Sequence, residues 1–178
     1  MNTQVISSKA RLFLFVWAQL GWFGCVYADK FGLQLLSLLI PALAWAVLLR
    51  TKSLPRRTLL LVFCLAAFGF LFDAALANFE LIHFNPQPNF ASIFGVPVWL
   101  VSMWLLFVTI LPLMAELFKK SAALNFVLGA IGGPLTYKSG EAFEVMYLSG
   151  PIVLIIYAAF WGIYFTSALY LIRKSYEN

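Results

Sequence analysis

Six apolar runs, separated by short polar segments, constrain this chain more than any other feature of its sequence. An α-helix needs roughly 20 apolar residues to cross about 30 Å of hydrocarbon. The runs cover residues 12–28, 31–49, 58–79, 97–116, 122–136 and 147–172. The pattern predicts an all-α fold, a polytopic membrane helix bundle with six transmembrane helices in a single integral membrane domain.

The composition excludes a soluble domain. Of the 178 residues, 63% are hydrophobic and only 11% are charged, whereas about 25% are charged in an ordinary soluble protein. So few charged side chains cannot cover the surface of a globular domain of this size. The high hydrophobic content also excludes an intrinsically disordered chain.

The positions of the basic residues predict the orientation. If the runs alternate across the membrane, ten of the 12 Lys and Arg residues lie on the side of the N-terminus and two on the other side. Loops on the cytoplasmic side of a membrane are enriched in Lys and Arg. We therefore expect a cytoplasmic N-terminus and C-terminus. The basic clusters are too short to form a surface for nucleic acid, so no nucleic-acid partner is expected.

Two alternatives to this topology remain open. The fifth run is short enough for a re-entrant hairpin, although that arrangement would place Arg173 and Lys174 on the opposite side. The first run, which ends in Val26-Tyr27-Ala28, resembles a cleavable signal peptide. Its two tryptophans and the central Gln19 favour a helix that is retained.

Asp73 is the clearest candidate for a functional residue. An ionisable side chain inside a membrane span costs about 2.5–3.5 kcal/mol on insertion scales and needs a partner or a role. If the third helix continues, Glu80 and His83 lie on nearly the same face as Asp73, because they follow it by seven and ten residues. The three residues are candidate catalytic acid or base groups, and the structural alternative is that Asp73 bonds a hydroxyl or a helix end.

The segment that follows the fifth run supplies candidate ligand-binding residues. We expect a loop there to bring a hydroxyl and charged groups towards Asp73. These residues are Tyr137, Lys138, Glu141 and Glu144. The alternative is that the two glutamates are solvated loop residues. One histidine falls short of the usual zinc ligand set, so neither a metal nor another cofactor is predicted.

Gly129 and Gly133 form a GxxxG ridge, which permits close approach of another helix. This ridge is the predicted contact for a homo-oligomer or a membrane partner, and Pro134 is expected to end or bend the helix. Membrane lipids are the other predicted partners.

We expect structural rather than functional roles for several other residues in or near the runs. Glu116 is expected to pair with Lys119 or Lys120, and Gln19 and Asn125 to form hydrogen bonds between helices. Trp99 and Tyr147 are expected to be interfacial anchors. Cys25 and Cys64 are interpreted as small buried residues.

Four segments together resemble a family of small, uncharacterised proteobacterial inner-membrane proteins. They are Gln19-Leu-Gly-Trp22-Phe-Gly-Cys-Val, Asp73, Pro97-Val-Trp99 with Trp104, and Gly133-Pro134-Leu-Thr-Tyr137-Lys-Ser-Gly140. The chain departs from the family pattern at Glu141-Ala142-Phe143. The resemblance implies a bacterial inner (plasma) membrane location. It also implies a connection to lipids, because such proteins are often encoded near fatty-acid-modifying genes.

These observations favour a lipid-linked enzyme or a lipid-binding accessory protein with a polar site at the outer leaflet. A small-solute transporter or channel is one alternative, because Pro41 and Gly150-Pro151 would allow broken helices. A structural subunit that docks a partner protein is the other. The sequence does not decide whether the protein is an enzyme.

Overall fold

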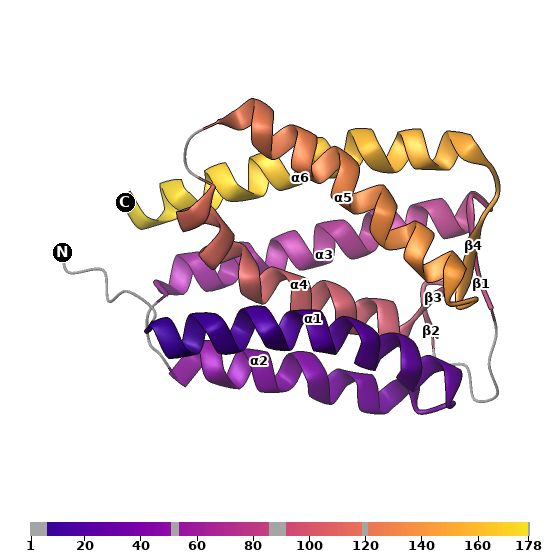
Figure 1. The fold of residues 1–178 in the computed structure, drawn as a ribbon, viewed down its shortest axis with the longest axis horizontal. Helices are drawn as coiled ribbons and strands as arrows, with labels where there is room; N and C mark the ends of the chain where they lie inside the picture. Colours follow the sequence, from indigo (N-terminus) through magenta and orange to yellow (C-terminus); the bar gives the residue numbers. More distant parts are fainter. Residues whose placement is uncertain (1–6, 51–53, 86–91, 119–120, 178) are drawn as a thin grey trace.

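The computed structural model describes residues 7–50, 54–85, 92–118 and 121–177. The predicted all-α class is confirmed, since the described chain is helical apart from four short strands (Figure 1). The helices are α1 Ser8–Lys30, η1 Gln34–Leu38, α2 Leu39–Arg50, α3 Arg56–Asn78, α4 Val98–Leu117, α5 Ala122–Ala142 and α6 Pro151–Glu177.

Polar and proline residues fix the helix starts. The hydroxyl of Ser7 accepts a hydrogen bond from the backbone N–H of Ala10, and that of Ser121 accepts one from Leu124, so both serines are N-caps. Pro151 is the first residue of α6, where the missing N–H of proline has no intrahelical partner to lose.

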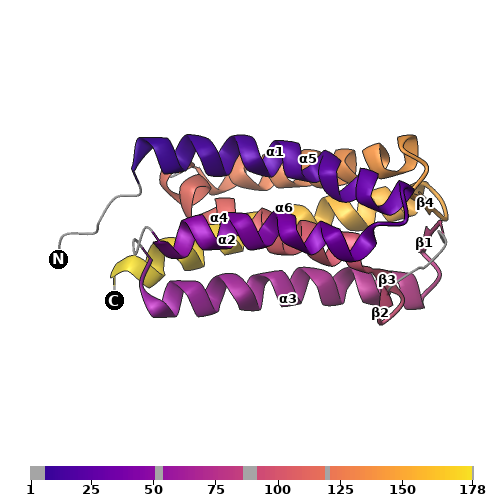
Figure 2. The ribbon, with the colours of Figure 1, turned by 90° about the horizontal axis from the view of Figure 1, so that it is seen from below.

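The helices pack around α4. This helix contacts α1, α2, α3 and α6, whereas α5 packs mainly against α6. Figure 2 shows α1 and α5 on the same face of the bundle and α3 on the opposite face. The helix α4 therefore lies beneath the space between α1 and α5.

Among the helices of the described ranges, four have the length and apolar composition of membrane spans. They are α1, α3, α4 and α6. The unit formed by η1 and α2, Gln34–Arg50, is apolar but shorter. The chain therefore has the architecture of a membrane protein.

The two ends of the bundle differ. One end carries two antiparallel strand pairs, β1 Ile82–Phe84 with β4 Met146–Leu148 and β2 Ser92–Ile93 with β3 Val96–Pro97. We call it the strand end. The start of α1 and the end of α6 lie at the opposite end, which we call the terminal end (Figure 1).

Several helix boundaries differ from the sequence prediction. The second run begins with the 3-10 helix η1, and α3 ends at Asn78, so the continuation that would have placed Glu80 and His83 on the same helix face as Asp73 does not occur. The helix α5 continues through Pro134 to Ala142, and α6 begins only at Pro151. A proline inside a membrane helix is tolerated where neighbouring groups satisfy the freed backbone.

Glu116 pairs with Arg11 of α1 at 3.0 Å, and its predicted partners Lys119 and Lys120 lie outside the described residues, so that pairing stays a prediction. Two other side-chain predictions are wrong. Trp99 is buried rather than an interfacial anchor, and Cys64 is exposed rather than buried. Tyr147, in contrast, is exposed at the strand end.

Candidate functional site

The carboxylate of Asp73 is the centre of a buried hydrogen-bond network. Asp73 lies on α3, five residues before the end of the helix at Asn78, and has no exposed surface. Its Oδ2 accepts a hydrogen bond of 2.6 Å from the indole N–H of Trp104. Its Oδ1 accepts one of 3.0 Å from the hydroxyl of Tyr157. The hydroxyl of Tyr137 lies 2.7 and 2.9 Å from the two oxygens and shares its proton between them.

This network joins four helices. Trp104 belongs to α4, Tyr137 to α5 and Tyr157 to α6, so each helix donates to the carboxylate of α3. The rings of Tyr137 and Tyr157 stack with their centroids 3.6 Å apart. Hydrogen bonds to an ionised group are roughly twice as strong as neutral ones. The network therefore fixes the orientation of Trp104 and Tyr137.

The structure does not place Glu80 and His83 beside Asp73. Glu80 follows the end of α3 with a positive φ of 58°, which turns the chain away from the helix axis. His83 lies in β1, where its ring stacks on Tyr147 with centroids 4.8 Å apart and its Nε2 lies 3.0 Å from the hydroxyl oxygen of Ser149. Both residues belong to the surface of the strand end.

Of the four predicted ligand-binding residues, only Tyr137 contacts Asp73. The expected loop is the last part of α5, and Lys138 pairs there with Glu141. The carboxylate of Glu141 also accepts a 2.7 Å hydrogen bond from the backbone N–H of Leu148, which ties α5 to β4. Glu144 is exposed and has a positive φ of 60°.

The GxxxG ridge packs within the chain. A Cβ added at Gly129 would lie 2.3 Å from the carbonyl oxygen of Trp161, and one at Gly133 would lie 2.1 Å from the Cγ of Trp161. The ridge predicted to bind a partner is therefore in contact with α6. In contrast, a Cβ at Gly132 would have no atom within 4 Å.

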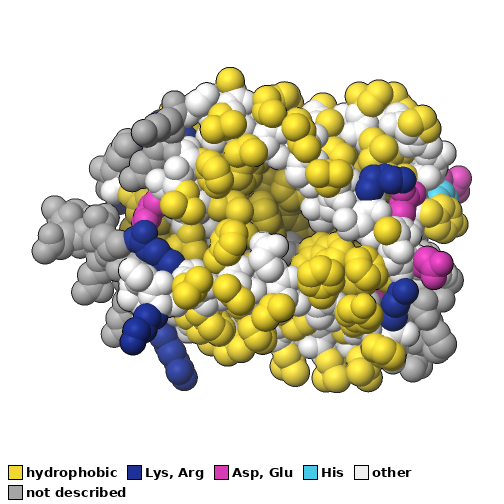
Figure 3. All heavy atoms as spheres, in the orientation of Figure 1, with side chains coloured by type: hydrophobic (Ala, Val, Ile, Leu, Met, Phe, Trp, Pro, Cys, Tyr) yellow, Lys and Arg dark blue, Asp and Glu magenta, His cyan; other side chains and the backbone are white. Residues whose placement is uncertain are grey.

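The open space at Gly132 belongs to a cavity of about 410 Å³. We call it the lateral groove. It appears in Figure 3 as a hollow with a hydrophobic floor on the side of the bundle. Its lining residues come from four helices: Ala18, Gln19 and Trp22 of α1; Trp99, Leu100, Met103, Trp104, Leu106, Phe107, Ile110 and Met114 of α4; Leu128, Gly129, Gly132, Gly133, Thr136, Tyr137 and Gly140 of α5; Trp161 and Phe165 of α6; with Phe118 and Met146 at its ends.

The lateral groove exists because α5 has glycine where a bundle helix usually has a large side chain. Gly132 and the neighbouring Thr136 cannot fill the space that faces α1. Along α4 the lining runs from Trp99 to Met114, about 22 Å at 1.5 Å per residue. The groove therefore extends over much of the roughly 30 Å of a bilayer core.

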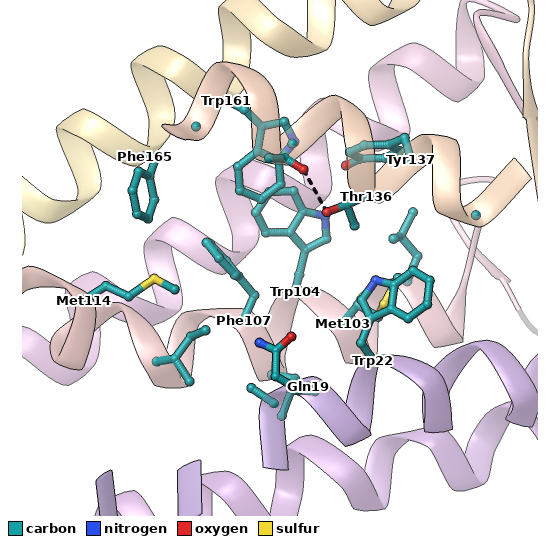
Figure 4. Close-up of a pocket in the computed structure, with 18 of the residues that line it drawn as sticks. Gln19, Trp22, Met103, Trp104, Phe107, Met114, Thr136, Tyr137, Trp161 and Phe165 are labelled. Carbon is teal, nitrogen blue, oxygen red and sulfur yellow. Dashed lines mark hydrogen bonds between the residues drawn. The ribbon is translucent and has the colours of Figure 1, made fainter. Parts of the chain in front are cut away.

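Two residues of the network also belong to the groove, and Figure 4 shows both of them in its lining. The side chains of Trp104 and Tyr137 line the groove and also bind the carboxylate of Asp73. Trp104 stacks on Trp161 with ring centroids 5.1 Å apart. From α1, the amide of Gln19 points into the groove from the opposite wall. Asp73 itself does not line the groove. Its carboxylate affects the groove by holding the side chains of Trp104 and Tyr137 in place.

Sequence reasoning missed Trp104 and Tyr157 as partners of Asp73. Both carry a polar tip on an apolar ring, and a buried Trp N–H or Tyr O–H usually has a hydrogen-bond partner. The sequence therefore indicated that both side chains need a hydrogen-bond partner, but it did not indicate that this partner is Asp73. Within the described ranges, no group of three or more His, Cys, Asp or Glu side chains is arranged to hold a metal ion.

A comparison with known families matches residues 11–167 to a family described as a protein of unknown function (DUF2878). The match confirms the expected resemblance to an uncharacterised family. No curated protein matches the chain, and no solved structure matches it.

Proposed function

The chain belongs to the DUF2878 family, and on that premise we propose that it is a lipid-binding membrane protein that holds an apolar lipid chain in the lateral groove. The observation that carries this proposal is the groove of about 410 Å³ between α1 and α5. Its volume lies in the range of about 300–1,000 Å³ that is usual for small-molecule sites.

The chemistry of the lining favours a lipid over a polar solute. Most of the lining is aromatic, aliphatic or methionine side chains. The groove opens on the side of the bundle (Figure 3), which faces hydrocarbon if the four apolar helices cross a bilayer. An apolar chain enters such a groove directly from the membrane, whereas a polar solute would first have to leave water.

The donors around Asp73 support a binding role rather than a catalytic one. Both oxygens of its carboxylate already accept two hydrogen bonds each. The network stabilises the walls of the groove near the strand end. We therefore assign Asp73 the role of a positioning residue for Trp104 and Tyr137.

The proposal includes six spans in a bacterial inner membrane, with the terminal end in the cytoplasm. The distribution of Lys and Arg supports it, since in the described part of the chain only two of these residues lie at the strand end, Lys30 and Lys138. The unit of η1 with α2 and the helix α5 would supply the fifth and sixth crossings.

Reporter fusions test this topology. A fluorescent protein fused after the C-terminus should fluoresce, because such proteins mature in the cytoplasm. Alkaline phosphatase inserted within residues 86–91 should be active, because it requires the periplasm. Fluorescence at the C-terminus together with an inactive phosphatase insertion would contradict the six-span arrangement.

Filling the groove tests the lipid proposal. In Gly132→Leu the new side chain enters the space that the lipid chain would occupy. Overpacking of about 1–3 kcal/mol corresponds to at least a fivefold loss of binding. We expect the purified variant to retain at least fivefold less lipid per protein molecule, measured by mass spectrometry after gentle detergent extraction.

Gly150→Leu is the matched control. A Cβ at Gly150 also has no atom within 4 Å, and Gly150 does not line the groove. This variant should keep the lipid content of the native protein. Equal lipid content in Gly132→Leu and Gly150→Leu would refute the assignment of the groove.

A further inference from the structure

Gln19 places a polar group in the middle of a mostly apolar groove. It is the central residue of α1, 11 residues from Ser8 and 11 from Lys30, or about 16 Å from each end. Its amide points into the groove in Figure 4. Within the described chain, this amide forms no hydrogen bond.

An amide at this depth needs a partner. A hydrogen-bonding group in an apolar medium is destabilised unless it is paired. Interhelical bonding, which we expected for Gln19 from the sequence, does not occur, because the side chain faces the groove. The ligand itself is therefore the group that can satisfy the amide.

We propose that the lateral groove selects lipids whose acyl chain carries a hydrogen-bonding substituent, a hydroxyl or keto group, towards its middle. The amide of Gln19 binds this substituent. This inference rests on the proposed lipid binding and adds the chemical class of the lipid.

The amide of Gln19 fits such a substituent because it both donates and accepts. A hydroxyl can satisfy either half of the amide, and a keto oxygen can accept from its NH₂. A plain alkyl chain would bury the amide of Gln19 without offering it a hydrogen-bond partner. A site built to bond a polar group rejects an analogue that lacks it, because the polar groups of the site are then left unpaired.

A competition experiment tests the selectivity. The purified full-length protein is offered equal amounts of stearic acid and a hydroxystearic acid with its hydroxyl at mid-chain, and the bound lipids are quantified by mass spectrometry. One hydrogen bond predicts a roughly threefold to tenfold preference for the hydroxylated chain. A second arm offers the same two chains as phosphatidylglycerol esters. A preference in either arm supports the proposal, and the arm in which it occurs distinguishes a free acid from a phospholipid.

Two variants remove the preference in different ways. Gln19→Leu should bind the two chains without preference, because it lacks the group that bonds the hydroxyl. Gln19→Leu combined with Leu20→Gln keeps the composition and moves the amide about 100° around α1. Leu20 is 61% exposed and does not line the groove, so this variant should also lose the preference.

The outcomes separate this inference from the proposed function. A native protein that binds both chains equally well overturns the role of Gln19 and leaves lipid binding intact. A preference that persists in Gln19→Leu overturns it as well. If neither chain binds to the native protein in either arm, lipid binding itself is refuted.

Discussion

Replacing Asp73 with alanine should lower the stability of the protein more than removal of any exposed carboxyl group. The substitution leaves two tyrosine hydroxyls and one indole N–H without their acceptor. Each buried donor left unpaired costs about 1–3 kcal/mol. We therefore expect a loss on the order of 3 kcal/mol or more. This loss lowers Tm by roughly 10 °C, at about 2–4 °C per kcal/mol for a chain of this size.

The Tm of Asp73→Asn should lie between the Tm of the native protein and that of Asp73→Ala. The amide keeps one acceptor oxygen for Trp104, and its NH₂ can donate to the hydroxyl of Tyr137 if that hydroxyl reverses its own hydrogen bond. The measurement is thermal unfolding in detergent, followed by tryptophan fluorescence.

Glu144→Gln is the control for Asp73→Asn, because it also neutralises a carboxyl group but at an exposed position. We expect its Tm to equal that of the native protein. An unchanged Tm in Asp73→Ala would show that the network does not stabilise the bundle.

The sequence could predict the helices of this protein but not the partners of its polar groups. Apolar runs and flanking charges depend on local sequence, so the six helices and the family resemblance were accessible. The burial of Asp73 was also accessible, since a carboxyl inside an apolar run must be paired. Trp104 and Tyr157 follow it by 31 and 84 residues, and only the packing of the helices selects them.

The length of α5 shows a second limit of prediction from local sequence. Pro134 and the surrounding glycines predict a helix end by local propensity. Contact with α6 along Gly129 and Gly133 outweighs this propensity and continues the helix to Ala142. The same glycines leave the groove open at Gly132, and an empty volume has no signature in a single sequence.

Gly129→Ala provides the strongest test of that packing. The added Cβ would lie 2.3 Å from the carbonyl oxygen of Trp161, a backbone atom that cannot rotate away. The helices α5 and α6 would have to separate, which would also displace Trp161 from its stack on Trp104. We expect destabilisation at or above the upper end of the 1–3 kcal/mol that is typical of overpacking.

Gly132→Ala, three residues away on the same helix, should have the opposite effect. Its Cβ meets no atom within 4 Å, and alanine is favoured over glycine inside a helix by about 0.5–1 kcal/mol. In thermal unfolding, the Tm of Gly129→Ala should therefore be well below that of the native protein, and the Tm of Gly132→Ala slightly above it. Both variants gain the same helix propensity, so the difference between their Tm values measures the contact of Gly129 with Trp161 and Phe165 of α6. Equal Tm values would mean that α5 does not pack on α6 through Gly129.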